Sequence, residues 1–215
     1  MKYSDSICIL SAIRPINIEN CQSFQSDKMQ IIFGDYQVIL SKLQEYNVTN
    51  YRFINLSKNS LFPLLDYQKL DCRIEYGAII RDQVTLKKNA IILMGAVINV
   101  GASIGENTMI DMNAVIGSNA QIGNNVHIGA GAVISGTMEP YASSPVIIGD
   151  NTFIGANSVI LEGIKIGKNV IVGASSVVTK DIPDNVVCYG NPSRIKRMTK
   201  KNDVNQIDMN LRWWI

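Results

Sequence analysis

Large aliphatic residues recur at every sixth position over two long stretches of this chain. The first stretch comprises Ile74, Ile80, Leu86, Ile92, Ile98, Ile104, Ile110, Ile116, Ile122, Ile128 and Ile134, and the second comprises Ile148, Ile154, Ile160, Ile166, Val172 and Val178. A period of six matches neither the helical repeat nor the two-residue repeat of a strand, but it does match a coil of three short strands. The spacing therefore predicts a parallel β-helix built from hexapeptide repeats.

A second inward residue, usually small, follows each large one by four positions in the first stretch. These residues are Ala78, Val84, Ala90, Ala96, Ala102, Thr108, Ala114, Ala120, Val126 and Ala132. Three hexapeptides close a triangular coil of about eighteen residues, whose interior the large side chains fill. Glycines and asparagines suit its corners, where the backbone angles are awkward for other residues. Hexapeptide β-helices are known for left-handed coiling, which we expect here, although the period itself does not define the hand.

The period divides the chain into three parts. Residues 1–70 lack it and predict a small α/β N-terminal domain. Residues 71–183 form the β-helix, with a loop inserted at residues 135–147 because the two stretches are fourteen residues apart where two repeats take twelve. Residues 184–215 form a short C-terminal tail. The expected fold class is mainly β, and the inserted loop is the natural place for a binding surface.

Within the N-terminal part, local signals predict three elements. A strand is expected over residues 29–33 and another over residues 51–54. Between them, Asp35 is suited to cap a helix that extends through Gln44. The expected apolar face of this helix comprises Val38, Leu40 and Leu43.

Composition excludes several classes of function. The hydrophobic fraction of 47% suits a substantial core, and a net charge of +2 gives no reason to expect nucleic acid or a membrane as a partner. No segment has the length of a transmembrane helix, residues 1–10 lack the features of a signal peptide, and the four cysteines have no metal-ligand spacing. We therefore expect a cytoplasmic protein with reduced thiols. A single histidine also argues against a metal site of several histidines.

Several segments of the β-helix resemble the tetrahydrodipicolinate N-acetyltransferases, a family of hexapeptide acyltransferases. These segments are IEYGAIIRDQV (74–84), MGAVINVGASIGENTMIDMNAVIGSNAQIGNNVHIGAGAVISG (94–136), EP (139–140), IGANSVILEGIKIG (154–167) and VVTKDIP (177–183). The resemblance implies an acetyl-CoA-dependent N-acetyltransferase. Its acceptor would be the amine of tetrahydrodipicolinate, in the L-2-amino-6-oxopimelate form, in diaminopimelate and lysine biosynthesis.

Polar residues that interrupt the repeat are candidates for the chemistry. An amine that attacks a thioester must lose a proton, and His127 is the natural general base. Asp111 occupies a position where the repeat prefers glycine; related succinyl-transferring enzymes carry an aspartate at the substrate amine there, which implies the same role here. Glu139 in the loop and Arg81 are candidates for binding the substrate. The Arg81 guanidinium could hold a carboxylate of the substrate through two hydrogen bonds.

The resemblance also implies where acetyl-CoA binds. The pantetheine arm lies along successive coils in this superfamily, so small residues are needed there, and the candidates are Gly155, Ala156, Gly173 and Ala174. Lys180 and Arg194 are candidates for contacts with the nucleotide phosphates. Each of these cations is equally compatible with a solvated basic tail.

Other readings of the same chain remain open. The acceptor could be an amino sugar or another small amine, or the β-helix could be a non-catalytic scaffold. A scaffold has no need of the polar outliers Asp111, His127 and Glu139. Flat faces with outward apolar residues also predict a homotrimer, in which three subunits cover one another. The outward apolar candidates are Ile91, Val97, Met109 and Val115.

Overall fold

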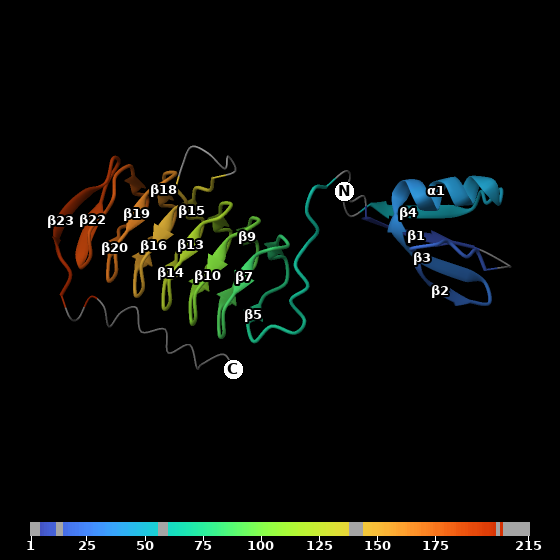
Figure 1. Cartoon of the computed structure of the whole chain (residues 1–215), viewed down its shortest axis with the longest axis horizontal. Helices are drawn as coiled ribbons and strands as arrows, with labels where there is room; N and C mark the ends of the chain where they lie inside the picture. The colour runs from blue at the N-terminus through green and yellow to red at the C-terminus, as the bar shows by residue number, and fades with distance from the viewer. Residues whose placement is uncertain (1–4, 12–14, 56–59, 138–143, 201–202, 204–215) are drawn as a thin grey trace. The chain divides into compact units, whose positions relative to one another are not determined.

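The computed structural model describes residues 5–11, 15–55, 60–137, 144–200 and 203. The chain forms two compact units, residues 1–63 and residues 64–215 (Figure 1). The first unit is a small α/β structure and the second is a parallel β-helix. The predicted fold class is thereby confirmed. In the described parts of the chain, no helix is long and apolar enough to cross a membrane.

A four-stranded antiparallel sheet and one helix make up the first unit. The elements are β1 (Asp5–Leu10), β2 (Gln22–Ser26), β3 (Met29–Asp35), α1 (Tyr36–Glu45) and β4 (Tyr51–Asn55), with the strand order β2-β3-β1-β4. Elements β3, α1 and β4 were expected from the sequence, whereas β1 and β2 were not. Strand β2 is exposed along its length, so it pairs with β3 through backbone hydrogen bonds without the alternation that marks a half-buried strand.

Helix α1 begins where the sequence predicts, but it buries a different face. The Asp35 carboxylate accepts hydrogen bonds of 2.8 and 3.2 Å from two N–H groups in the first turn, as an N-cap does. Val38 is 43% exposed, whereas Ile39 and Leu43 are fully buried. The predicted apolar face was therefore wrong at Val38. Residues four apart share a face of a helix, and the pair Ile39 and Leu43 defines the one that packs on the sheet.

Three parallel sheets form the faces of the β-helix. We call them the polar sheet, the histidine sheet and the valine sheet, after their outward residues. The polar sheet contains β7 (Thr85–Leu86), β10 (Ser103–Ile104), β13 (Gln121–Ile122), β16 (Ile147–Ile148) and β19 (Lys165–Ile166). The valine sheet contains β6 (Ile79–Ile80), β9 (Val97–Ile98), β12 (Val115–Ile116), β15 (Val133–Ile134), β18 (Val159–Ile160) and β21 (Val177–Val178).

The histidine sheet is the longest of the three. It contains β5 (Arg73–Ile74), β8 (Ile91–Ile92), β11 (Met109–Ile110), β14 (His127–Ile128), β17 (Phe153–Ile154), β20 (Ile171–Val172), β22 (Val186–Tyr189) and β23 (Arg194–Met198). Strand β22 pairs in parallel with β20, and β23 pairs antiparallel with β22. The first part of the predicted C-terminal tail thus extends this sheet.

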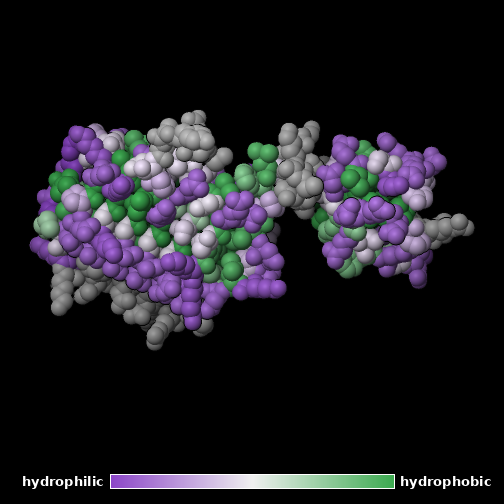
Figure 2. Space-filling view, in the orientation of Figure 1, coloured by the Kyte–Doolittle hydropathy of each residue, from purple (hydrophilic) through white to green (hydrophobic). Residues whose placement is uncertain are grey.

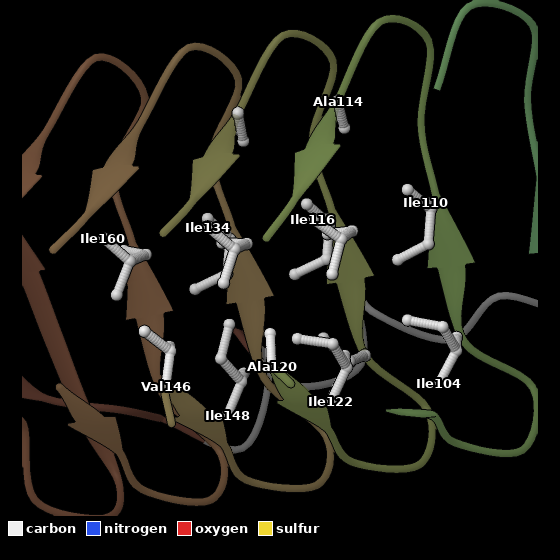
Figure 3. Packing of buried hydrophobic residues seen from close by; sticks show 14 of the residues in the cluster. Ile104, Ile110, Ala114, Ile116, Ala120, Ile122, Ile134, Val146, Ile148 and Ile160 are labelled. Atoms are coloured by element: carbon white, nitrogen blue, oxygen red, sulfur yellow. The ribbon is translucent and has the colours of Figure 1, made fainter. Parts of the chain in front are cut away.

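The large aliphatic residues of the repeat all point into the coil. Figure 3 shows Ile104, Ile110, Ile116 and Ile122 turned toward one another in the interior, and each is at most 4% exposed. The small residues between them are equally buried, and Ala114 and Ala120 are examples. Outward residues instead form bands on the surface of the β-helix, apolar beside polar (Figure 2).

Asparagines form a hydrogen-bonded ladder at the corner that follows the polar sheet. The side-chain amide of each donates to the next along Asn89, Asn107, Asn125 and Asn151, at 3.1, 3.3 and 3.2 Å. Their φ angles lie between 53° and 59°, a region that asparagine tolerates better than other residues with a side chain. Asparagine therefore suits this corner for two reasons: its backbone tolerates the positive φ angle, and its side chain forms the hydrogen-bonded ladder.

Candidate functional site

The single histidine lies in an outward column of the histidine sheet. His127 is in register with Met109 on one side and with Phe153 on the other. Its ring centroid is 4.9 Å from that of Phe153, and the two planes are tilted by 34°. The His127 side chain is 21% exposed. Most outward residues of these sheets are partly covered in the same way, because the side chains of successive coils flank one another.

Asp111 faces His127 from the preceding coil. The His127 Nε2 and the Asp111 Oδ2 are 3.6 Å apart, and the Asp111 side chain is 20% exposed. The other carboxylate oxygen, Oδ1, accepts a 2.7 Å hydrogen bond from the Met112 N–H, which holds the carboxylate toward the histidine. A separation of 3.6 Å is too long for a direct hydrogen bond. A hydrogen-bonding group that contacts both residues would therefore lie beside the pair, about 3 Å from each atom.

The surroundings keep His127 neutral around pH 7. Burial lowers the pKa of His127 below its ordinary value of 6.5, and the nearby Asp111 carboxylate opposes this shift. A neutral imidazole has a free lone pair on one nitrogen and can accept a proton. The site therefore offers a base and a carboxylate side by side.

The turn after each strand of the histidine sheet forms what we call the histidine corner. Successive coils stack there: Gly131 donates to the Met112 carbonyl, Asn157 to that of Ala130 and Ser175 to that of Ala156, all at 2.8–2.9 Å. Side-chain size changes along this stack. The outer position is occupied in turn by Tyr76, Met94, Met112, Ala130, Ala156 and Ala174. The first three side chains are long and are 99%, 48% and 43% exposed. From the coil of His127 onward, the same position is occupied by alanine.

The predicted cofactor-binding residues lie on this same corner. Gly155 and Gly173 stack beyond Asp111 in the position that follows the inward residue, and Ala156 and Ala174 come next. A Cβ on Gly155 would be 2.4 Å from the backbone nitrogen of Ala174, and one on Gly173 would be 2.7 Å from the Tyr189 Cβ. Contact between coils thus already requires both glycines. The short alanines at the surface are what leave the backbone of the corner accessible.

Of the remaining candidates, Arg194 lies at the end of the histidine corner, whereas Arg81 and Lys180 follow the valine sheet. Arg194 begins β23 and pairs with Tyr189, at the far end of the histidine corner. Lys180 is exposed and follows the valine sheet, at a different corner. Arg81 also follows the valine sheet, in its first coil, where its N–H donates to the Ile98 carbonyl at 3.0 Å. Glu139 lies outside the described residues. Within one chain, the structure brings neither Arg81 nor Lys180 to the His127–Asp111 pair.

Two features of this region were not expected from the sequence. One is Phe153 against the histidine. The other is a hollow of about 690 Å³ on the valine sheet, at the start of the inserted loop. It is lined by Val115, Gly117, Val133, Ile134, Ser135, Gly136, Leu161 and Glu162. Its signal in the sequence is the pair Leu161–Glu162, which stands where the repeat often has glycine.

Within the described ranges, no three His, Cys, Asp or Glu side chains gather as a metal site would require.

Two family models match the β-helix. Residues 101–136 match the bacterial transferase hexapeptide model of six repeats, and residues 145–180 match the hexapeptide repeat of succinyl-transferase. Among solved structures, a perosamine N-acetyltransferase variant from Caulobacter crescentus with CoA and GDP-perosamine superimposes with a TM-score of 0.54 at 29% identity. The match covers 59% of this chain and 57% of that one. A hexapeptide transferase family protein from Anaplasma phagocytophilum shares the fold, with a TM-score of 0.53 at 22% identity.

Curated relatives cover more of the chain. The 2,3,4,5-tetrahydropyridine-2,6-dicarboxylate N-acetyltransferase of Thermoanaerobacter pseudethanolicus is 60% identical over 183 residues, 84% of this chain and 76% of that protein. Its namesake in Alkaliphilus metalliredigens is 51% identical over 180 residues, which are 82% and 76% of the two chains. The enzyme of the same name from Listeria ivanovii is 52% identical over 190 residues, which are 87% of this chain and 79% of that protein. This chain therefore belongs to the 2,3,4,5-tetrahydropyridine-2,6-dicarboxylate N-acetyltransferase family.

Proposed function

We propose that this protein transfers the acetyl group of acetyl-CoA to the amine of tetrahydropyridine-2,6-dicarboxylate, taken in its open-chain amino form, in the cytoplasm. The product supplies diaminopimelate and lysine biosynthesis. The observation that carries the proposal is the His127–Asp111 pair, a half-buried base whose Nε2 lies 3.6 Å from a carboxylate oxygen, in a chain that is 51–60% identical to N-acetyltransferases of that name.

The gap between the two residues suits an amine nitrogen. A nitrogen placed about 3 Å from each side chain donates one N–H to the Asp111 carboxylate and presents another to the His127 Nε2. Asp111 then orients the amine, and His127 removes its proton as the nitrogen attacks. This requires the neutral imidazole with an unprotonated Nε2, and burial of His127 favours the neutral form. No metal is needed for this proton transfer.

Acetyl-CoA supplies the thioester carbonyl that the amine attacks. The new C–N bond forms as the C–S bond breaks, and the coenzyme A thiolate leaves with the proton that His127 took from the amine. The corner residues fit such a co-substrate, because the short side chains of Ala130, Ala156 and Ala174 leave the backbone open from the coil of His127 toward the end of the β-helix. Gly155 and Gly173 hold these coils close together. Arg194, at the end of this corner, suits the nucleotide phosphates. Lys180 lies at another corner, so it would serve a co-substrate shared with a neighbouring subunit.

Binding of a dicarboxylate also calls for cations or oriented amides. Asp111 is negative, so the acceptor's carboxylates need positive groups that one chain does not supply beside it in the described ranges. Arg81 of a neighbouring subunit is suited to meet this need in a trimer, and Glu139 stays a candidate for a further polar contact. The valine sheet supports a trimer, since its outward residues are apolar along the length of the coil.

Two other functions give different expectations. The structural match to perosamine N-acetyltransferase favours an amino sugar as the acceptor. Acetylation of an amino sugar needs the same base, but it needs no cations to bind two carboxylates. A non-catalytic scaffold needs neither the base nor the carboxylate, so it gives no reason for the two to lie side by side.

A thiol-release assay with acetyl-CoA tests the proposal. We expect tetrahydropyridine-2,6-dicarboxylate to be acetylated with a kcat/KM well above that of amino-sugar nucleotides. A higher kcat/KM with an amino sugar would reassign the acceptor and leave the acetyl transfer intact. The absence of thiol release with every amine of the panel would instead favour the scaffold.

A further inference from the structure

We propose that Phe153 is a positioning residue for His127: it holds the imidazole in the orientation that directs Nε2 to Asp111, and it shields the ring from water. The inference rests on the proposed function, since it assumes that His127 is the base. It adds a residue that the chemistry of acetyl transfer does not by itself require, because phenylalanine has no group that takes part in the reaction.

The contact between the two rings is built into the stacking of coils. Phe153 belongs to the coil that follows His127, and the two residues are paired in register between β14 and β17. The His127 N–H donates a 3.0 Å hydrogen bond to the carbonyl of Thr152, the residue before Phe153. The backbone thus holds the rings at 4.9 Å, and they can separate only by side-chain rotation.

The other side of the imidazole is closed by Met109. This residue is in register with His127 on the preceding strand, and it is only 8% exposed although it points outward. A histidine on the surface of a strand ordinarily samples several rotamers. Met109 and Phe153 thus flank His127 on the two neighbouring strands, and the Asp111 carboxylate approaches Nε2 from the turn after Met109.

Few charged groups act on the imidazole. Asp111 is the charged group that follows β11, 3.6 Å from Nε2. On the side of β17, the residues after Ile154 are Gly155 and Ala156, which carry no charge. Asp150, which precedes β17, lies at another corner and pairs with Lys168 at 2.8 Å. Apolar cover and one carboxylate therefore define the electrostatic environment of His127, and Phe153 supplies a large part of the cover.

Substitutions at Phe153 separate its two roles. Phe153→Leu keeps an apolar side chain but removes the flat ring. The His127 imidazole should then be less well oriented, while it stays largely shielded from water. Phe153→Ala removes both. Ile171→Ala is the matched control, because Ile171 is the next outward residue of the same column and is not in register with His127. Phe153→Tyr preserves the ring and should behave as the unchanged protein does.

The test combines kinetics with a direct titration of the histidine. The chain has one histidine, so in protein free of a purification tag the Hε1 proton of its ring gives a single NMR signal, whose pH dependence reports the pKa of His127. The same variants are assayed for kcat and KM with acetyl-CoA and the dicarboxylate. His127→Ala is included, because normal turnover in that variant would refute the base assigned in the proposed function, independently of Phe153.

We expect Phe153→Leu to lower kcat by roughly 10-fold with a smaller change in KM, the size of effect that follows from a loosened reacting group. Phe153→Ala should lower kcat at least as much and raise the measured pKa of His127 toward 6.5, with a parallel shift in the acid limb of kcat/KM. Ile171→Ala and Phe153→Tyr should change neither. If His127→Ala is inactive while Phe153→Leu and Phe153→Ala keep the original kcat and His127 titration, the positioning role is refuted and the base assignment stands.

Discussion

The Asp111 carboxylate and the His127 imidazole come from successive coils, and their nearest atoms are 3.6 Å apart. Met109 and His127 occupy the same outward position in these coils, and Asp111 follows two residues after Met109, at the turn. Stacking of the coils therefore places an acid and a base side by side without any long-range loop. The pair exists only because the two strands are paired in this register.

Removal of the imidazole should abolish most of the activity. We expect His127→Ala to lower kcat by roughly 10²–10⁴-fold, the usual contribution of a positioned general base, with the fold and the oligomer unchanged. Thiol release measures the activity and light scattering the assembly. Gln121→Ala is a suitable control, because Gln121 has the equivalent outward position on the polar sheet. Near-normal turnover of His127→Ala would leave the histidine with a structural role alone.

We expect the carboxylate of Asp111 to affect the pH dependence of the reaction as well as the orientation of the amine. Because this negative charge raises the pKa of His127 against the effect of burial, Asp111→Asn should lower that pKa further. The acid limb of the kcat/KM profile should then move to lower pH, while the maximal kcat falls. Steady-state rates between about pH 5 and 8 provide the measurement. An acid limb that stays in place would show that Asp111 does not act on the histidine.

Self-association should depend on the valine sheet. Val115 is 38% exposed in the single chain, and a charge at this apolar position should prevent close contact between subunits. The chain mass of 23.7 kDa gives a trimer of about 71 kDa. We expect light scattering to find this mass for the unchanged protein and a smaller one for Val115→Asp. Gln121→Asp on the polar sheet should remain trimeric. A stable monomer of the unchanged protein would contradict the proposed assembly.

One buried hydroxyl links two coils and should be needed for stability. Thr108 is fully buried at a position that is usually alanine; its Oγ1 donates to the Gly123 carbonyl at 2.7 Å and accepts from the Val126 N–H at 3.0 Å. Thr108→Val fills the space but leaves both backbone groups without this partner. We expect a loss of about 1–3 kcal/mol in the free energy of unfolding, measured by urea titration. Thr108→Ser, which keeps the hydroxyl, should lose less; an equal loss in both would argue against the hydrogen bonds.

The packing inside the coil explains why so much of the fold followed from the sequence. A period of six can bury isoleucines such as Ile110 and Ile116 only if each repeat forms one face, so the repeat specifies both the strands and their register. The N-terminal unit has no such period. There the edge strand β2 was missed and the buried face of α1 was partly misjudged, because the choice between Val38 and Ile39 depends on what the helix packs against.

The candidate site divides in the same way. Asp111 is recognisable in the sequence because it stands where the repeat prefers glycine, and His127 because it is the one histidine of the chain. The family follows from the motifs around them. Their separation, the cover that Met109 and Phe153 provide, and the placement of Arg81 and Lys180 on another corner became evident only in the folded chain. Sequence specifies which side chains point outward on each coil, whereas the contacts between outward side chains depend on how the coils stack. That stacking brings residues from different repeats together and sets the solvent exposure on which the basicity of His127 depends.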